Sequence, residues 1–371
     1  MAPDRTQVVQ PGQGPDQADG ADPGTSPGPG PGPSSSPSPS PSRDPYFDNA
    51  KLLAVVLVVC GHFWEPLLPY TGERGVTALY LLTYAFHMPA FIVMSGYFSR
   101  SFAAQPRQMR RLVTGVLVPF LFWNTLLTGY TDLLNGQHVT LRPLTPVWIT
   151  WFLMSLFLWR LTAPLWSTLR APVAVATAVF LASGAFPFGA QLSLTRTLQF
   201  LPFFVLGLTI RPSRLAWLRE TRWVRRAAVP VLAAALAAAY LLAGHLSPAW
   251  LYRSGGAHDL HVSYARWLTE TTAIYAAALV LTAAFLSLIP RTRTWFTPLG
   301  AGTMYAFLIH AFLRETLIHT GAYPHIAHSA SAELTLTATS VALALTLCTP
   351  RIRQTLRPLV EPRLTFLFRN P

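Results

Sequence analysis

The sequence predicts an all-α fold: a polytopic transmembrane helical bundle of about ten spans with both termini in the cytoplasm. Two observations on composition point to this class, because 51% of the 371 residues are apolar and only 12% are charged, about half the charged share of a soluble domain. A third is the placement of charge, since 22 of the 28 Lys and Arg residues lie in the two tails, between alternate apolar stretches or in the ends of stretches that adjoin those segments. Short cytoplasmic loops of membrane proteins collect Lys and Arg in this way.

Ten apolar stretches approach the roughly 17 to 25 residues that cross about 30 Å of hydrocarbon. In chain order they cover residues 50–68, 76–98, 112–131, 145–165, 172–189, 192–210, 228–245, 267–289, 299–318 and 331–349. With the N-terminus inside, the arginine-rich segments after the second, fourth, sixth and eighth stretches all face the cytoplasm. The net charge of +13 then follows from topology and from anionic lipid headgroups, so it does not call for a nucleic-acid partner.

Composition divides the chain into three parts. Residues 1–45 are dominated by Pro, Gly and Ser, which is typical of a disordered tail, here a cytoplasmic one. Residues 46–350 form the membrane domain, and residues 351–371 form a basic cytoplasmic tail. The expected location is the plasma membrane, as a multi-pass protein. Cys60 and Cys348 fall inside the first and last apolar stretches, which indicates packed thiols rather than a disulfide.

Three histidines interrupt the apolar stretches: His62 in the first, His87 in the second and His310 in the ninth. Polar side chains at mid-membrane are costly to insert, so they usually face a cavity or a partner and serve a function. A rise of about 1.5 Å per residue brings all three to within a few Å of one depth. If their helices are neighbours, they line one intramembrane cavity. The alternative is that each ring only hydrogen-bonds a neighbouring helix. No carboxylate or thiol lies at ligand spacing, so no metal site is expected.

Two charged residues accompany His62 in the first stretch. Glu65 follows it by three residues and so lies on the same helix face. A carboxylate there can orient the ring and raise its basicity, as in many general-base sites. The alternative is that Pro66 bends the helix end and turns Glu65 towards water. Lys51, the single lysine among 28 basic residues, lies about three helical turns before His62.

Five segments carry a family resemblance, in the same order along the chain. They are YFDNAKLLAVVLVVCGH (46–62), FHMPAFIVMSGYFSR (86–100), WFLMSLFLWRL (151–161), FLPFFVLGL (200–208) and LGAGTMYAFLIH (299–310). In the first of them, ten residues separate Lys51 from His62. Together the segments resemble the acyltransferase 3 family of integral-membrane O-acyltransferases, and the Asp-Asn-x-Lys form is similar to the fucose 4-O-acetylase branch.

The resemblance implies transfer of an acyl group, usually acetyl from cytoplasmic acetyl-CoA, to a hydroxyl of a sugar or of a glycosylated or polyketide-like small molecule. The expected partners are therefore an acyl-CoA donor, a hydroxyl-bearing acceptor and membrane lipids. Acyl-CoA is a co-substrate in this chemistry, so no permanently bound cofactor is expected. A competing function is a transporter or flippase for a carbohydrate-type substrate, which would also need polar residues at mid-membrane.

A hydroxyl is a poor nucleophile at neutral pH, so a histidine that removes its proton contributes about 10² to 10⁴ in rate. We therefore expect His62 to be the general base, with Glu65 as its catalytic partner. Lys51 is placed to meet CoA phosphates or to stabilise charge as the thioester opens. Its alternative role is that of an ordinary interfacial anchor. The residues expected to bind donor or acceptor are Asp48, Lys51, His87, Ser95, Tyr305 and His310.

Overall fold

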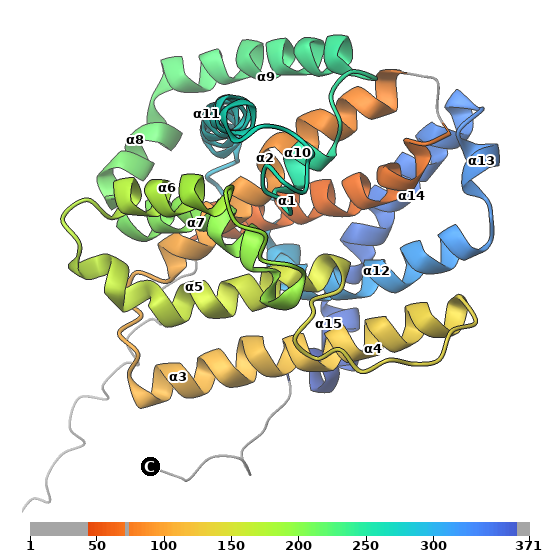
Figure 1. Cartoon of the computed structure of the whole chain (residues 1–371), viewed down its shortest axis with the longest axis horizontal. Coiled ribbons are helices and arrows are strands. Elements are labelled where there is room, and N and C mark those ends of the chain that lie inside the picture. The colour runs from red at the N-terminus through yellow and green to blue at the C-terminus, as the bar shows by residue number, and fades with distance from the viewer. Residues whose placement is uncertain (1–43, 71–73, 362–371) are drawn as a thin grey trace, which may run out of the picture. The chain divides into compact units, whose positions relative to one another are not determined.

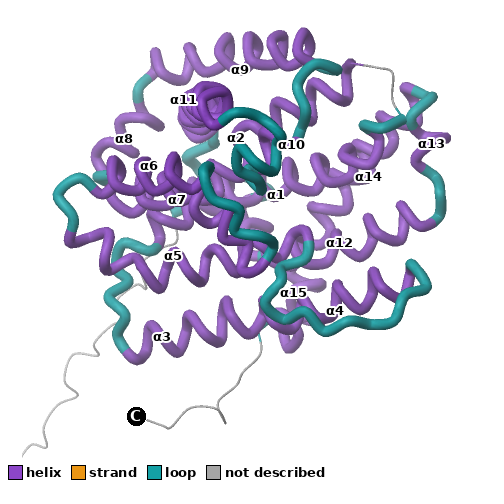
Figure 2. Tube along the Cα trace, in the orientation of Figure 1, coloured by secondary structure: helices purple, strands orange, loops and turns teal. Residues whose placement is uncertain are grey.

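A computed structural model describes residues 44–70 and 74–361, and over these residues the fold is all helical (Figures 1 and 2). The α-helices are α1 (Pro45–Trp64), α2 (Arg74–Phe98), α3 (Pro106–Leu112), α4 (Val118–Leu134), α5 (Trp151–Thr168), α6 (Pro172–Ser183), α7 (Leu194–Thr209), α8 (Pro212–Glu220), α9 (Arg222–Leu242), α10 (Ala249–Tyr252), α11 (Tyr264–Leu288), α12 (Thr303–His319), α13 (Tyr323–Ile326), α14 (Ala330–Leu347) and α15 (Pro350–Val360). The predicted all-α class is confirmed. The proposed tail 1–45 lies almost entirely outside the described residues.

Among the described residues, eight helical segments are long and apolar enough to cross a membrane. They are Pro45–Leu67, Arg74–Phe98, Pro106–Leu134, Trp148–Thr168, Gln191–Thr209, Arg222–Leu242, Tyr264–Leu288 and Ala330–Leu347. The other two predicted stretches correspond to α6 and α12, of 12 and 17 residues, which are shorter. Ten crossings therefore remain a prediction. The third segment begins six residues earlier than predicted because Pro106 starts a helix that includes its charged first turns.

Helix ends that are far apart in the sequence meet at one end of the bundle. At one end the Asn49 side chain, in the first turns of α1, donates to the carbonyls of Pro290 and Thr292 after α11. The Tyr305 hydroxyl, near the start of α12, donates to Glu361 just after α15 at 3.3 Å. Pro290 and Thr292 lie in the segment that leads from α11 into α12. The starts of α1 and α12 and the end of α15 therefore lie together. This arrangement fits termini on one side of the membrane, and the cytoplasmic side stays a prediction.

Helices α1 and α2 occupy the middle of the bundle, and α2 packs along α7 (Figure 1). Glycines set the distance between these two backbones. A Cβ atom added to Gly96 would lie 2.1 Å from the Phe204 carbonyl oxygen, and one added to Gly207 would lie 2.0 Å from that of Val93. Only glycine fits such an approach. Gly96 and Gly207 therefore allow the close packing of α2 and α7.

We expect Gly207→Ala to destabilise the protein by about 1 to 3 kcal/mol, because the new methyl group forces α2 and α7 apart. The measurement is the thermal unfolding midpoint of the purified protein in detergent. Gly115→Ala is the matched control, since nothing lies within 4 Å of the added methyl group. The midpoint should fall in the first variant and not in the second. Equal midpoints would show that the two helices do not depend on this contact.

Candidate active site

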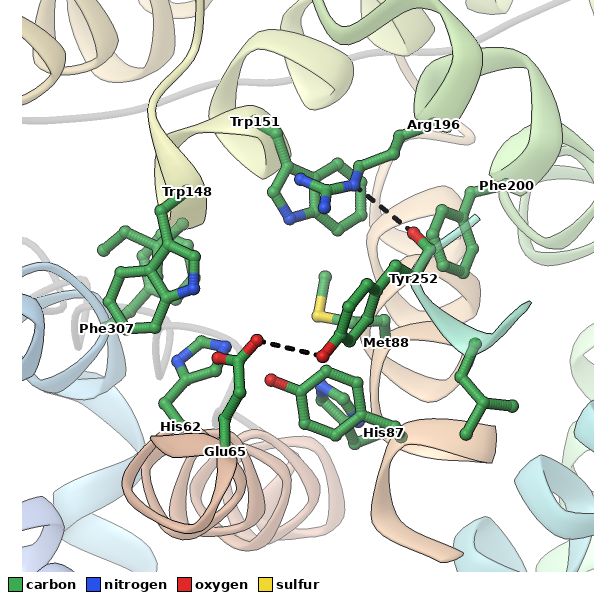
Figure 3. A pocket seen from close by; sticks show the side chains of 13 residues that line it. His62, Glu65, His87, Met88, Trp148, Trp151, Arg196, Phe200, Tyr252 and Phe307 are labelled. Carbon is green, nitrogen blue, oxygen red and sulfur yellow. Dashed lines mark hydrogen bonds between the residues drawn. The ribbon is translucent and has the colours of Figure 1, made fainter. Parts of the chain in front are cut away.

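A cavity of about 70 Å³ lies beside the end of α1, between α2, α7, α10 and the turn before α5 (Figure 3). Its polar lining residues are His62, Glu65, Tyr84, His87, Arg196 and Tyr252. The remainder of the lining is aromatic or aliphatic, with Met88, Trp148 and Phe307 among its residues. The cavity thus brings His62 and His87 together with charged groups inside a largely apolar bundle.

His310 lies directly behind His62, and the two imidazoles are hydrogen-bonded to each other. The distance between His62 Nδ1 and His310 Nε2 is 2.8 Å, and His310 Nδ1 is 2.8 Å from the Ala306 carbonyl oxygen. A carbonyl only accepts, so His310 donates from Nδ1 and its Nε2 accepts from His62 Nδ1–H in the neutral pair. His62 Nε2 therefore keeps its lone pair and is free to take a substrate proton.

His87, like His310, is oriented by a hydrogen bond from its ring to a backbone carbonyl one turn earlier. Its Nδ1 is 2.7 Å from the Thr83 carbonyl oxygen one turn earlier in α2, so Nδ1 carries the proton and Nε2 is an acceptor. Both histidines that line the cavity can therefore accept a hydrogen bond from a hydroxyl. The convergence predicted for the three histidines is observed, with His310 in a supporting position rather than in the lining.

Glu65 does not orient His62, and that prediction is wrong. Its carboxylate accepts from the Tyr252 hydroxyl at 3.0 Å and from the Arg314 guanidinium at 3.2 Å. A guanidinium is a stronger partner for a carboxylate than a neutral imidazole is. The ring of His62 is oriented by His310 instead. Glu65 still lines the cavity, so the alternative in which it turns away to water is also not observed.

Arg314 ties the end of α1 to α12. Its Nε donates to the His62 carbonyl oxygen at 3.0 Å, and its two terminal nitrogens pair with Glu65 and Glu315. Arg314 was not singled out in the sequence analysis. The sequence does contain an indication that Arg314 lies near the site, because it follows His310 by four residues and so lies on the same helix face.

Trp148 covers the histidine pair. Its ring centroid is 4.5 Å from that of His62 and 6.0 Å from that of His310, and the Arg314 guanidinium lies 4.1 Å from its centroid. The backbone at Trp148 has φ 41°, a left-handed conformation that is costly for a bulky residue and is held only by its surroundings. Asn124 supplies that support, with side-chain hydrogen bonds to Arg142, Thr145, Val147 and Thr150.

Tyr252 reaches the cavity from α10, where its hydroxyl accepts from Tyr80 and donates to Glu65. Burial and the neighbouring carboxylate raise the pKa of Tyr252 to about 12, so the phenol stays a donor at neutral pH.

The next residue, Arg253, has a left-handed backbone conformation, and burial lowers the pKa of its guanidinium to about 10. Its guanidinium lies within 5.9 Å of the ring centroids of Phe180, Phe200, Phe203 and Tyr275. This aromatic cage anchors the end of α10.

A second cavity, of about 150 Å³, contains Lys51 and Ser95. The Lys51 ammonium is 2.7 Å from the Asp48 carboxylate, so three of the predicted binding residues lie together at this position. Met88 and Phe307 line both this cavity and the one that contains His62. The two cavities are therefore neighbours that share a wall.

Tyr305 is not among the lining residues of either cavity. It is buried, and its hydroxyl donates to Glu361. Its expected role in binding stays a prediction, and the structure does not bring Tyr305 to His62 and His87. The reason is helical geometry, because five residues along an α-helix turn the side chain by about 140° away from the first one.

Metal ligation finds no support within residues 44–70 and 74–361, where no group of three or more His, Cys, Asp or Glu side chains is placed to hold an ion. Cys60 and Cys348 are both buried free thiols. The absence of a permanently bound cofactor stays a prediction.

Long apolar helices around a buried, hydrogen-bonded histidine pair define an integral membrane protein with a candidate active site among its helices. The chain belongs to the acyltransferase 3 family, because the model of that family, described as an acyltransferase domain, matches residues 44–350.

The chain is also similar to nodulation protein NolL of Mesorhizobium japonicum. The two are 36% identical over 95 residues, which cover 23% of this chain and 24% of that protein. The chain therefore aligns with about a quarter of that relative. No solved structure matches the chain significantly.

Proposed function

We propose that this protein is an O-acyltransferase that moves an acetyl or other short acyl group from acyl-CoA to a hydroxyl of a sugar or a glycosylated small molecule. The plasma membrane is its proposed location, and a fucose 4-O-acetylase-like branch its proposed subfamily. The observation that supports this most is the pair of adjoining cavities. One offers the lone pair of His62, the other the ammonium of Lys51, and Met88 and Phe307 lie between them.

In this proposal the acceptor occupies the cavity of His62, and its hydroxyl donates to Nε2. The hydroxyl oxygen attacks the thioester carbon as His62 takes the proton, and the C–S bond breaks as the ester forms. The CoA thiolate leaves and recovers that proton as a thiol. His310 accepts from Nδ1–H throughout, so the imidazolium of the transition state stays oriented. The Nδ1 proton stays on His62, so His310 acts as a positioning residue.

The charges around the cavity suit this step. Glu65 and Arg314 form an ion pair, so they contribute little net charge. Arg196 also lines the cavity, and its Nε donates to the Tyr252 carbonyl at 3.3 Å. We propose that the remaining donors of its guanidinium face the acceptor or the oxygen that becomes negative as the thioester is attacked.

Purified protein with labelled acetyl-CoA and a panel of glycosylated small molecules tests the proposal. The expected result is a covalent acetyl ester on one acceptor, formed only when acetyl-CoA is present. Movement of a carbohydrate across vesicles without a covalent product would instead favour a transporter or flippase.

Lys51→Ala is expected to raise the KM for acyl-CoA about tenfold and to leave the KM for the acceptor unchanged, because a point charge for the donor phosphates is lost. Lys51→Arg is the conservative control and should change either constant little. Since Lys51→Ala also leaves the Asp48 carboxylate without its partner, the double variant with Asp48→Asn separates the two effects. A donor KM that returns to normal in the double variant would contradict a role for Lys51 in donor binding.

A topological prediction completes the proposal. Reporter fusions at Gln108 and Arg219 are expected to read cytoplasmic, and fusions at Gly136 and Gly256 external, because of the bias in basic residues. An internal signal at Gly256 would overturn the ten-span arrangement.

A further inference from the structure

A larger cavity, of about 470 Å³, lies between α2, α9 and α11, and every residue that lines it is apolar. Alanines of α9 form much of one wall, at positions 235, 238 and 239. Their side chains are too short to fill the space between α9 and the other two helices. The cavity is open along α9 and α11, where its lining residues Leu242 and Val280 are exposed, so an apolar molecule of the membrane has access to it.

The lining determines the chemistry of the occupant. Without a polar partner the cavity cannot hold ordered water, whereas cavities lined by aliphatic side chains take up apolar molecules. All three surrounding helices are long and apolar enough to cross a membrane, and α9 has only 11% of its apolar window buried within the protein. Figure 1 shows α9 at the edge of the bundle. A hydrocarbon chain is thus the occupant that both the lining and the position favour.

Leu251 lies between this cavity and the candidate active site, because it lines both. The next residue, Tyr252, donates to Glu65 in the cavity of His62. A molecule whose chain lies between α9 and α11 and whose polar end passes Leu251 would place that end beside Tyr252 and His62. The donor cavity with Lys51 meets the active site at another wall, that of Met88 and Phe307. The apolar cavity is accordingly on the acceptor side.

We propose that the cavity between α2, α9 and α11 binds the alkyl chain of the acyl acceptor, so that the acceptor is a glycolipid whose sugar hydroxyl reaches His62. This inference rests on the proposed O-acyltransferase function and specifies its acceptor. Leu251 and the end of α10 form the point where the apolar chain gives way to the polar head. The competing possibility is that the cavity holds an ordinary membrane lipid and has no role in binding the acceptor.

The test compares methyl and dodecyl glycosides of the same sugars, with fucose first, as acceptors of labelled acetyl groups by the full chain in lipid nanodiscs. The measured quantity is the ratio of kcat/KM for the dodecyl glycoside to that for the methyl glycoside. Ala235→Phe fills the cavity, and Ala237→Phe is its matched control because Ala237 is exposed on α9 and is not a lining residue. Since each ratio is taken in the same nanodiscs, partition of the alkyl chain into lipid cancels between variants.

The expected result is that the ratio falls by about tenfold or more in Ala235→Phe, the effect of excluding about two methylene groups from an apolar site, and is unchanged in Ala237→Phe. Ala238→Leu is a smaller substitution that serves the same purpose if Ala235→Phe does not fold. A ratio that is equal in the wild type and in all variants overturns the inference and leaves the proposed function standing. Acetylation of none of the glycosides, with or without the alkyl chain, overturns the proposed function itself.

Discussion

His62→Ala is expected to lower the rate of acyl transfer by at least about 10²-fold while the amount of folded protein stays the same. The physical reason is the loss of the lone pair on Nε2, the nitrogen that the bond to His310 leaves unprotonated, and general-base catalysis contributes about 10² to 10⁴ in rate. Steady-state kinetics with donor and acceptor varied separately measure the effect, which should appear in kcat rather than in either KM.

His258→Ala is the matched control for this substitution. His258 is a highly exposed side chain in the loop before α11, away from the cavity of His62. Its replacement should leave both kcat and the thermal midpoint unchanged. If folded His62→Ala turned over like the wild type, His62 would be a packed side chain and not the base.

His310→Leu is expected to reduce kcat by about 10²-fold, because His62 then loses the acceptor that fixes its tautomer and ring orientation. His310→Gln should restore much of this loss, since the amide oxygen can accept from His62 Nδ1–H where Nε2 accepted before. The KM for donor and acceptor should change little in either variant. The measurements are steady-state kinetics and the thermal unfolding midpoint in detergent for each of the two variants.

A structural role for His310 predicts a different pattern. In that case kcat would follow the thermal midpoint, and His310→Gln would recover activity only as far as it recovers stability. Equal kcat values for the Leu and Gln variants at equal midpoints would show that His310 does not position the base.

The elements of the fold could be predicted because the requirement to span hydrocarbon leaves a strong pattern in the sequence. Each of the ten predicted apolar stretches corresponds to a helix. That His62, His87 and His310 lie at a common level could also be predicted, since a helix rises by about 1.5 Å per residue whatever its neighbours are. This simple geometry was enough to bring the three histidines into one region.

The contacts between helices could not be predicted, because a single sequence does not show which faces meet. His62 and His310 are 248 residues apart, and neither position indicates the other. The preference of Glu65 for Arg314 depends on a helix that packs against the end of α1. The left-handed backbone of Trp148 has no signal in the sequence either, because the Asn124 side chain that supports it comes from α4.

The most direct test of acyl transfer by this protein is the fate of the label from acetyl-CoA in the presence of glycoside acceptors. We predict an acceptor that gains the mass of one acetyl group in an alkali-labile ester, with release of CoA thiol, in the wild type but not in His62→Ala. Release of CoA thiol without any acylated acceptor, or equal ester formation by the wild type and by His62→Ala, would contradict a hydroxyl transfer that depends on His62.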